Sequence, residues 1–484
     1  MKNINTKFLG FIIVLNAHSA MAQISSEDKI SYKKLATNLS QVQEMRVYMA
    51  DASGTGHQQA TQTVMRYLRK LGFKGSYDLI IADTVKATKT TVLKQGLPFY
   101  DPTKAGQQCD SQKTICVRTL SEFQADTGAK PLKYGISGAD DGYEVPGTYE
   151  MKFIGAAELK VEKYIALQPI GWSSHEGIDE VGKEFVQKKL QGLGLAYHDT
   201  VEANALAVAG FQQFKASTDP SENIRGENLS YLLTNEHKFD IQTIYGMGLI
   251  PNVHNVFGTV AKLASGVRAH AEKEGFALFN RPKLLLTFST LSEDEWYLSE
   301  YQFGSMDSNI QPVPTSNIQL YDIRDADLVA KLSKKMTSPD QVAVIAVGRV
   351  PQGIYLKFVE AADLPILVGG KNTIDEAMSM GIPYFNTVQD TSDLSIYTTD
   401  ADGNGITLYE EQVSAISQVS EKLARGDSSP SSLNSFYPIM VAMFTKDSEY
   451  YKLFHARERT DTTKIFIKDK IAVLMSMAFD GDAQ

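Results

Sequence analysis

A glycine turn that leads directly into a histidine is the first feature of this sequence with the residue types for chemistry. The stretch ADASGTGHQQAT spans residues 50–61 and contains Gly54, Gly56 and His57. The preceding MRVYM predicts a strand, and the following QQATQTVMRYLRKLG predicts a helix that ends at Gly72. We therefore expect His57 at the amino end of a helix, beside whatever occupies the turn.

Two interpretations of His57 stay open from the loop alone. Free N–H groups at a helix start can hold an anion, and a histidine there can take a proton from a hydroxyl nucleophile. The positive end of the helix favours the neutral imidazole that a base needs. Alternatively, His57 is a polar first-turn residue that packs on a neighbouring loop. The turn is not a dinucleotide fingerprint, because Gln59 occupies the third glycine position, and no Walker G-K-[ST] follows.

A second glycine turn occurs in AADLPILVGGKNTIDEAMSMGIPYF, where a predicted buried strand at 364–368 leads into Gly369 and Gly370. We predict a helix from about Thr373, whose amino end favours a diphosphate, while the glycines let the chain approach a ligand closely. Glu376 is placed to accept hydrogen bonds from ribose hydroxyls. The same spacing from Thr373 to Glu376 also fits a capping box, in which the glutamate bonds back to the cap.

Together the two segments resemble glycosyltransferases of the GT-B fold, in particular the group of monogalactosyldiacylglycerol synthases and peptidoglycan-lipid N-acetylglucosaminyltransferases. The resemblance implies a nucleotide-sugar donor, uridine-linked, and an acceptor hydroxyl (lipid, glycan or protein), with no metal or other cofactor required. It implies the following roles: His57 as the catalytic base; Ser53, Gly54 and Gly56 as the acceptor-side loop; and Gly369, Gly370, Asn372, Thr373 and Glu376 as donor contacts.

Two segments depart from that family pattern. The turn after the first strand of the second domain is FSTLSEDE, residues 288–295, which has no glycine, although Ser289 and Thr290 could donate hydroxyls. The region at about 86–150 is rich in Gly, Asp, Pro and Thr and has no family counterpart, so we interpret it as an insertion.

The alternation of strand-like and helical runs predicts an α/β fold with parallel sheets. We expect two Rossmann-like domains that face a cleft, in a GT-B-like arrangement, with a helical C-terminal segment. Strands are predicted at RVYMA, YDLIIAD, YIALQPI, LSYLLT, KLLLTFST, QVAVIAVGR, GIYLKFV and LPILVGG. The predicted units are a signal peptide at 1–22, an acceptor-side domain at 23–250, a linker at 251–281, a donor-binding domain at 282–427 and the helical segment at 428–484.

The N-terminus has the pattern of an export signal. Lys2 and Lys7 precede the apolar run at 8–17, and Ala20-Met21-Ala22 fits a signal peptidase site. The run is short for a membrane span, no later stretch is transmembrane in character, and a buried N-terminal strand is the alternative. We therefore expect a periplasmic or secreted protein with no integral membrane segment.

Composition excludes some classes of partner. The 484 residues are 43% hydrophobic and 22% charged, which is typical of a soluble globular protein, and the net charge is −9. An acidic chain is not expected to bind nucleic acid through its overall charge. In an oxidising compartment Cys109 and Cys116, the two cysteines, are expected to form a short-loop disulfide rather than stay free thiols.

Three further segments have chemically suggestive residues and simpler alternatives. Residues 400–411 have the spacing of a calcium loop, but the strand-like LSIYTT before them favours a plain turn. Residues 173–176, which include His175, could line the cleft, or Ser174 could only cap a following helix. His254 is more typical of a structural hinge position.

The sequence thus predicts an exported glycosyltransferase that inverts the donor's anomeric centre. Nucleotide sugars are made in the cytoplasm, so an exported transferase needs another donor or delivery into another cell, or has lost the activity. Two alternatives stay open. One is an exported two-domain solute-binding protein, and the other is a sugar-nucleotide epimerase on the same fold.

Overall fold

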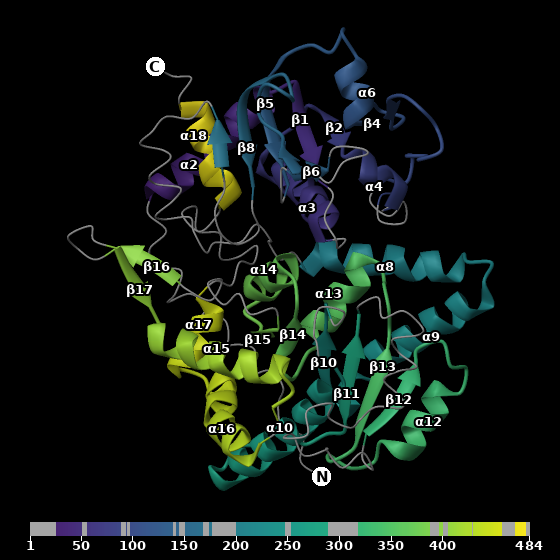
Figure 1. The fold of residues 1–484 in the computed structure, drawn as a ribbon, viewed down its shortest axis with the longest axis vertical. Helices are drawn as coiled ribbons and strands as arrows, with labels where there is room; N and C mark the ends of the chain where they lie inside the picture. Colours follow the sequence, from purple (N-terminus) through teal and green to yellow (C-terminus); the bar gives the residue numbers. More distant parts are fainter. Residues whose placement is uncertain are drawn as a thin grey trace, which may run out of the picture.

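The computed structural model is an α/β structure with two large sheets (Figure 1). It describes residues 26–50, 56–88, 93, 97–138, 142–144, 151–167, 174–176, 200–246, 253–288, 318–387, 396–399, 405–427, 429–456 and 470–480. The predicted signal peptide at 1–22 lies outside these residues. Within them, no helix combines the length and the apolar character that crossing a bilayer requires.

The first sheet has seven strands in the described part of the chain. In spatial order they are β3 (Gln108–Cys109), β4 (Ile115–Thr119), β2 (Ser76–Ile81), β1 (Glu44–Met49), β5 (Leu132–Ser137), β8 (Val161–Ala166) and β9 (Ser174–Glu176). The five inner strands pair in parallel, and the two outer strands pair antiparallel with their neighbours. The predicted strands at 46–50 and 77–83 are therefore confirmed as β1 and β2. The strand predicted at 164–170 overlaps β8, and residues 168–170 lie outside the described residues.

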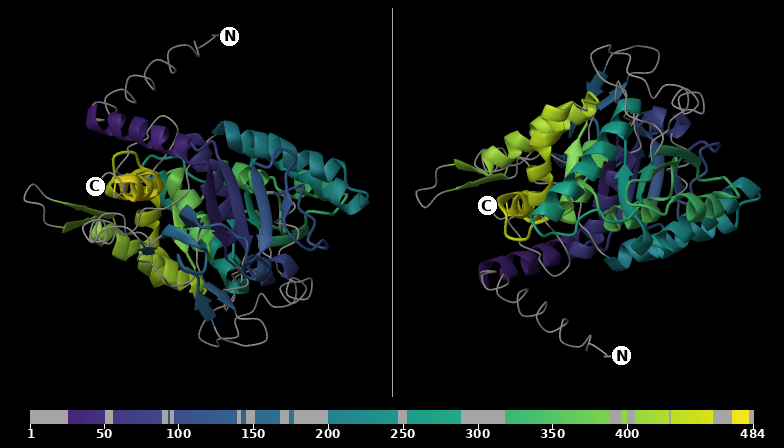
Figure 2. Two further views of the ribbon diagram at one scale, coloured as in Figure 1. Left: turned by 90° about the horizontal axis from the view of Figure 1, so that it is seen from above. Right: turned by 90° about the horizontal axis from the view of Figure 1, so that it is seen from below.

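In the described ranges, five helices accompany this sheet: α2 (Ser26–Gln41), α3 (Gly56–Leu71), α4 (Asp83–Thr88), α6 (Leu120–Ala125) and α18 (Lys470–Asp480). The predicted helix after the opening turn is α3, which ends at Gly72 with a φ of +117°. The last helix, α18, comes back from the far end of the chain to contact α2, and the two lie side by side in Figures 1 and 2. Its Ile471 and Leu474 belong to the same apolar core as the first sheet.

The second sheet has six strands among the described residues, and all of its pairings are parallel. In spatial order they are β12 (Ile318–Asp322), β13 (Val342–Ala346), β11 (Lys283–Thr287), β10 (Asp240–Ile244), β14 (Ile366–Val368) and β15 (Tyr384–Asn386). Helices cover both faces, so β11 has three consecutive leucines: Leu285 faces one core and Leu284 and Leu286 face the other.

The helices on the second sheet form two layers. One contains α8 (Thr200–Lys215), α9 (Pro220–Thr234), α12 (Leu328–Lys335) and α13 (Gln352–Glu360), with the short 3-10 helix η1 (Glu236–Lys238) leading into β10. The other contains α10 (Val253–Lys273), α14 (Lys371–Ser379), α15 (Glu410–Ala424), α16 (Pro430–Phe444) and α17 (Glu449–His455). In Figure 1, α3, α8, α13 and α14 lie between the two sheets.

Two segments predicted as strands are helices. LSYLLT belongs to α9, which starts at the Asp219 cap with Pro220 in the first turn and buries Leu229 and Leu232 at helical spacing. GIYLKFV belongs to α13, whose Ile354 and Phe358 point into one core. Both runs look strand-like because each is apolar on more than one side.

Two strands of the inner, parallel part of the first sheet, β4 and β5, fall in the region predicted as an insertion. β4 pairs with β2, and β5 pairs with β1 in the middle of the first sheet, so the region at about 86–150 contributes central strands. The polar composition misled the prediction because Arg118 of β4 is buried beside a buried carboxylate, Asp78.

The second sheet also starts earlier than predicted. β10, which lies before the predicted boundary at 250/251, pairs with β11 and β14. That boundary therefore does not separate the strands of the two sheets. Likewise, the predicted C-terminal segment at 428–484 divides between the two cores, since α16 packs on the second sheet and α18 on the first.

Candidate functional site

Both large sheets have a point at which the order of their strands reverses. The chain places β2 and β4 on one side of β1, and β5 and β8 on the other. It repeats this around β10, with β11 and β13 on one side and β14 and β15 on the other. In open α/β sheets, ligands bind beyond the carboxyl ends of the strands at such points. The two glycine turns found in the sequence follow β1 and β14, so both lie at these positions.

The first turn is described from Gly56, the first residue of α3. The backbone of His57 lies in the first turn of that helix, as predicted, while its side chain and the predicted Ser53 and Gly54 lie outside the described residues. The role of His57 as a base therefore stays a prediction.

Below this turn, α3 packs closely on the end of β5. A Cβ added to Gly138 would lie 2.1 Å from the Cα of Thr61, so only glycine fits there. Gln58 is fully buried, and its Nε2 donates to the Ala50 carbonyl at 2.8 Å, which fixes the end of β1 to α3. Gln58 is not among the residues predicted for this site, although a polar residue on the buried side of a helix next to a candidate loop is a signal for such a role.

The second turn is built by contact between two glycine backbones. Gly246, which follows β10, has a φ of +80°, and a Cβ on it would lie 2.8 Å from the Cα of Gly369. Gly370 is extended (φ −152°, ψ 138°), and among the described residues a Cβ there would meet only Tyr245, at 3.8 Å. Gly246 and Gly369 therefore serve the fold, whereas Gly370 would accept a side chain without a clash with the described residues.

The capping-box interpretation of this turn is wrong. α14 begins at Lys371, and the Gly370 carbonyl accepts hydrogen bonds from the N–H groups of Thr373 and Ile374 at 3.0 and 3.1 Å. Thr373 is thus inside the helix rather than at its cap. Of the predicted donor contacts, Thr373 is 4% exposed and Glu376 is 5% exposed, and the side chain of Asn372 lies outside the described residues.

An aromatic cluster backs the turn from the direction of β10, β11 and α13. The Tyr355 ring lies 5.8 Å from that of Tyr245 and 5.2 Å from that of Phe288, between ring centroids. Burial, and secondarily Tyr245, raise the pKa of Tyr355 well above its ordinary value. The phenol therefore stays protonated at physiological pH and can only donate or accept a hydrogen bond.

The helices of the first sheet and those of the second sheet meet in a chain of polar contacts that joins α3 to α14. Arg66 of α3 donates from Nη2 to Oε1 of Gln352 at 3.2 Å, and Nε2 of Gln352 donates to Oε1 of Glu376 at 3.2 Å. Glu202 of α8 forms ion pairs with Arg66 at 2.6 Å and with Lys70 at 2.7 Å. We call these five residues the inter-sheet clasp.

The clasp lines a pocket of about 30 Å³. A volume of that size holds about one water molecule, far less than the 300 Å³ or more of a typical ligand site. Glu376 faces this pocket, so in this arrangement its carboxylate serves the contact between α3, α8, α13 and α14.

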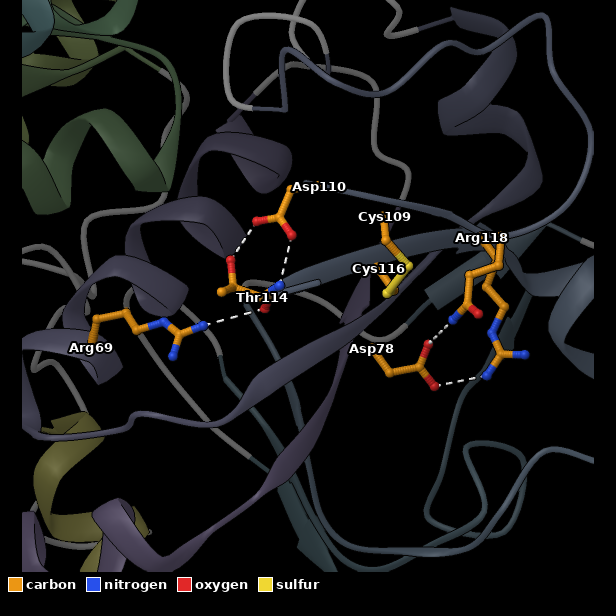
Figure 3. The surroundings of a disulfide bond; sticks show 8 residues. Arg69, Asp78, Cys109, Asp110, Thr114, Cys116 and Arg118 are labelled. Atoms are coloured by element: carbon orange, nitrogen blue, oxygen red, sulfur yellow. Dashed lines mark hydrogen bonds and ion pairs between the residues drawn. A yellow bond between two sulfur atoms is a disulfide. The ribbon is translucent and has the colours of Figure 1, made fainter. Parts of the chain in front are cut away.

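The predicted disulfide is confirmed. Cys109 and Cys116 lie opposite each other on β3 and β4 and are joined (Figure 3). Within the loop that they close, the Asp110 carboxylate accepts hydrogen bonds from both the N–H and the hydroxyl of Thr114. The Thr114 carbonyl accepts from Arg69 at the end of α3, at 3.3 Å, so the loop braces that helix.

The remaining predicted segments are only partly described. Residues 396–399 and 405–408 pair as the antiparallel strands β16 (Ile396–Thr399) and β17 (Gly405–Leu408), while residues 400–404, where the predicted turn or calcium loop begins, lie outside the described residues. The strands β6 (Gly142–Glu144) and β7 (Met151–Phe153) also pair antiparallel. Residues 174–176 form the edge strand β9, and His254 is the second residue of α10. The side chains of these residues, and Ser289 and Thr290, lie outside the described part of the chain. Within the described ranges, no three His, Cys, Asp or Glu side chains form a group that could hold a metal ion.

Comparison with known proteins gives no relative from which a role could be transferred: no protein-family model matches the chain, and no curated protein matches it.

Proposed function

We propose that this chain is an exported glycosyltransferase with two Rossmann-like domains, one around each large sheet, in a GT-B-like arrangement. The observation that carries the proposal is the start of α14. Among the described residues a Cβ on Gly370 would meet Tyr245 alone, at 3.8 Å, and Gly370 lies where the strand order reverses, at the positive end of a nine-residue helix. A diphosphate is the ligand chemistry that such a turn suits.

The position of α3 supports a second substrate on the opposite side. This helix starts with Gly56 and His57 at the carboxyl end of β1, and it contacts α14 directly. A group bound beyond β1 and a group bound beyond β14 would therefore lie on neighbouring helices, as transfer between two substrates requires.

The chemistry that fits this layout is a single displacement. An acceptor hydroxyl oxygen forms a bond to the anomeric carbon, and His57 takes the hydroxyl proton. The bond from the anomeric carbon to the diphosphate oxygen breaks with its electron pair, and the amino end of α14 stabilises the leaving diphosphate. The product has the inverted anomeric configuration.

Nucleotide binding is tested by calorimetry with UDP and UDP-sugars on the wild type and on Gly370→Ala. In the part of the chain that the structure describes, the added methyl meets only Tyr245, at an ordinary contact distance, so we expect an unchanged urea midpoint and at least a tenfold loss of UDP affinity. If no nucleoside diphosphate or nucleotide-sugar binds the wild type, the proposal fails.

Transfer is tested by turnover of the nucleotide-sugar that binds, with and without cell lysate as a source of acceptor. His57→Ala should lose 10²-fold or more of the transfer rate and keep UDP binding, as expected for a general base. His237→Ala, at an exposed position in η1, is the matched control and should keep full activity. Conversion of the nucleotide-sugar into its epimer without any acceptor would instead identify an epimerase.

A further inference from the structure

The inter-sheet clasp ends at Glu376, the carboxylate for which the proposed function has a use. We infer that Gln352 is the positioning residue of Glu376, and that Arg66 and Glu202 hold Gln352 in place, so that the contact of α3 with α13 decides whether Glu376 can bind a ligand. The identity of that ligand, a nucleoside diphosphate, rests on the proposed function. The evidence for the clasp is independent of it and consists of the contacts below.

The charges at its two ends fix the orientation of the Gln352 amide. Its oxygen accepts from the guanidinium of Arg66 and its nitrogen donates to the carboxylate of Glu376, both at 3.2 Å. A flipped amide would set N–H against guanidinium N–H and oxygen against carboxylate oxygen, and both pairs repel. Arg66 and Glu376 therefore both favour this orientation of the amide, and loss of Arg66 removes one of the two.

Glu376 cannot serve a ligand in this state. It is 5% exposed, it accepts a hydrogen bond from Gln352, and the pocket in front of it is the size of one water molecule. A ribose that used this carboxylate would have to displace the Gln352 amide. If only a fraction of molecules has the clasp open, the apparent affinity for the nucleotide falls by that fraction.

The ion pairs of Glu202 form the solvent-exposed end of the clasp, and their strength should depend on salt. Two cations share the Glu202 carboxylate, and the side chains of Arg66, Lys70 and Glu202 are 25–32% exposed. Ion pairs with that exposure weaken as salt shortens the Debye length from about 8 Å at physiological strength to about 3 Å at 1 M. We therefore expect the clasp to loosen in high salt and on loss of the Glu202 charge.

The first experiment measures the clasp without any nucleotide. Spin labels are attached at Lys74→Cys, after α3, and at Lys334→Cys, on α12. Pulsed electron resonance then reports the distance between the first-sheet and second-sheet parts of the chain. The described cysteines are both in the disulfide, which favours selective labelling. Glu202→Gln should broaden the distance distribution towards longer values, and 1 M salt should broaden it for the wild type. Glu449→Gln, which breaks an exposed pair with Lys452 on α17, is the control and should leave it unchanged.

The second experiment measures coupling to the site with UDP as the probe. Opening the clasp should tighten binding, so Glu202→Gln and Gln352→Ala should each lower the apparent Kd several-fold at low salt, and the difference from the wild type should shrink at 1 M salt. Glu376→Gln should weaken binding. A residue that merely supports the fold would give the opposite sign or no change for Gln352→Ala.

The outcomes separate the two claims. Unchanged label distances in Glu202→Gln and in high salt overturn the clasp, whatever UDP does. Weaker UDP binding by Gln352→Ala overturns the positioning role. A wild type and variants that bind no nucleoside diphosphate overturn the proposed function and the coupling with it, while the label distances still decide whether the clasp opens.

Discussion

Replacing Asp78 by asparagine should be the most damaging single change in the first sheet. Asp78 lies on β2 with its side chain 2% exposed, and its carboxylate accepts from Arg46 Nε at 2.9 Å and from Arg118 Nη2 at 2.8 Å. Gln107 donates to its other oxygen at 3.4 Å. Asp78→Asn keeps the shape and removes the charge, so the two guanidinium groups lose their shared counterion.

The loss of stability in Asp78→Asn depends on the hydrogen bonds and ion pairs that Arg46 and Arg118 retain. Breaking a buried ion pair by removing one partner costs about 3–5 kcal/mol, because the other charge stays buried. Arg46 still donates to the carbonyls of Leu159 and Lys130, and Arg118 still pairs with Asp126 at 2.8 Å. These contacts place Asp78→Asn at the lower end, about 3 kcal/mol. Burial already lowers the pKa of Arg46, and loss of Asp78 removes its largest opposing influence.

The assay is urea unfolding followed by far-ultraviolet circular dichroism. With a slope of about 2–3 kcal/mol per molar urea, the midpoint should fall by about 1–1.5 M. Asp126→Asn is the matched control, since Asp126 binds the same Arg118 from a position where its side chain is 42% exposed. Its midpoint should move much less. Equal shifts for the two variants would refute the argument that burial of the shared carboxylate sets the cost.

Three further changes have effects that the structure also determines. Replacing both Cys109 and Cys116 by serine removes a crosslink across a sequence separation of 7, and the chain-entropy model gives a loss of about 2.5 kcal/mol in the free energy of unfolding. The urea midpoint should therefore fall, and a reductant should lower the midpoint of the wild type only. Burial lowers the pKa of Lys283 to about 8, below an unfolded value of about 10.4, so the unfolded chain binds more protons between these pH values. Stability should therefore rise there with pH relative to Lys283→Gln, and a constant difference between the two unfolding curves from pH 7 to 10 would contradict this. Gly353→Ala should destabilise by roughly 1–3 kcal/mol, because its Cβ would lie 2.2 Å from the backbone of Ala207 on α8; a midpoint rise, the usual result of Gly→Ala in a helix, would count against that close contact.

The sequence predicts those elements whose apolar residues alone define them. β13 is an uninterrupted apolar run, β11 has three consecutive leucines, and α3 has apolar residues at helical spacing with a glycine stop, so all three are confirmed. α13 is misread because it is buried on several sides, which removes the periodicity that separates a helix from a strand.

Elements whose polar residues are buried are missed for a different reason. β10 contains Asp240, Gln242 and Thr243, each 1–2% exposed. Nε2 of Gln242 donates to the Pro365 carbonyl at 2.6 Å, across 123 residues of sequence. No local window contains that acceptor, so the strand reads as a polar segment. The same holds for β4, where Arg118 is neutralised by a residue 40 positions earlier.

In the candidate site, too, the local pattern is predicted from the sequence and the long-range contact is not. A glycine pair between an apolar strand and a helix is a local pattern, and the structure places Gly369 and Gly370 at such a turn. The partner of Glu376 is not local: Gln352 lies 24 residues earlier, and Arg66 lies 286 residues before Gln352. From the sequence, the nearest hydrogen-bond partner expected for Glu376 is the cap of its own helix, as in a capping box. Because the helix starts three residues earlier than that pattern assumes, the Glu376 carboxylate accepts a hydrogen bond from Gln352 of α13 rather than from the cap.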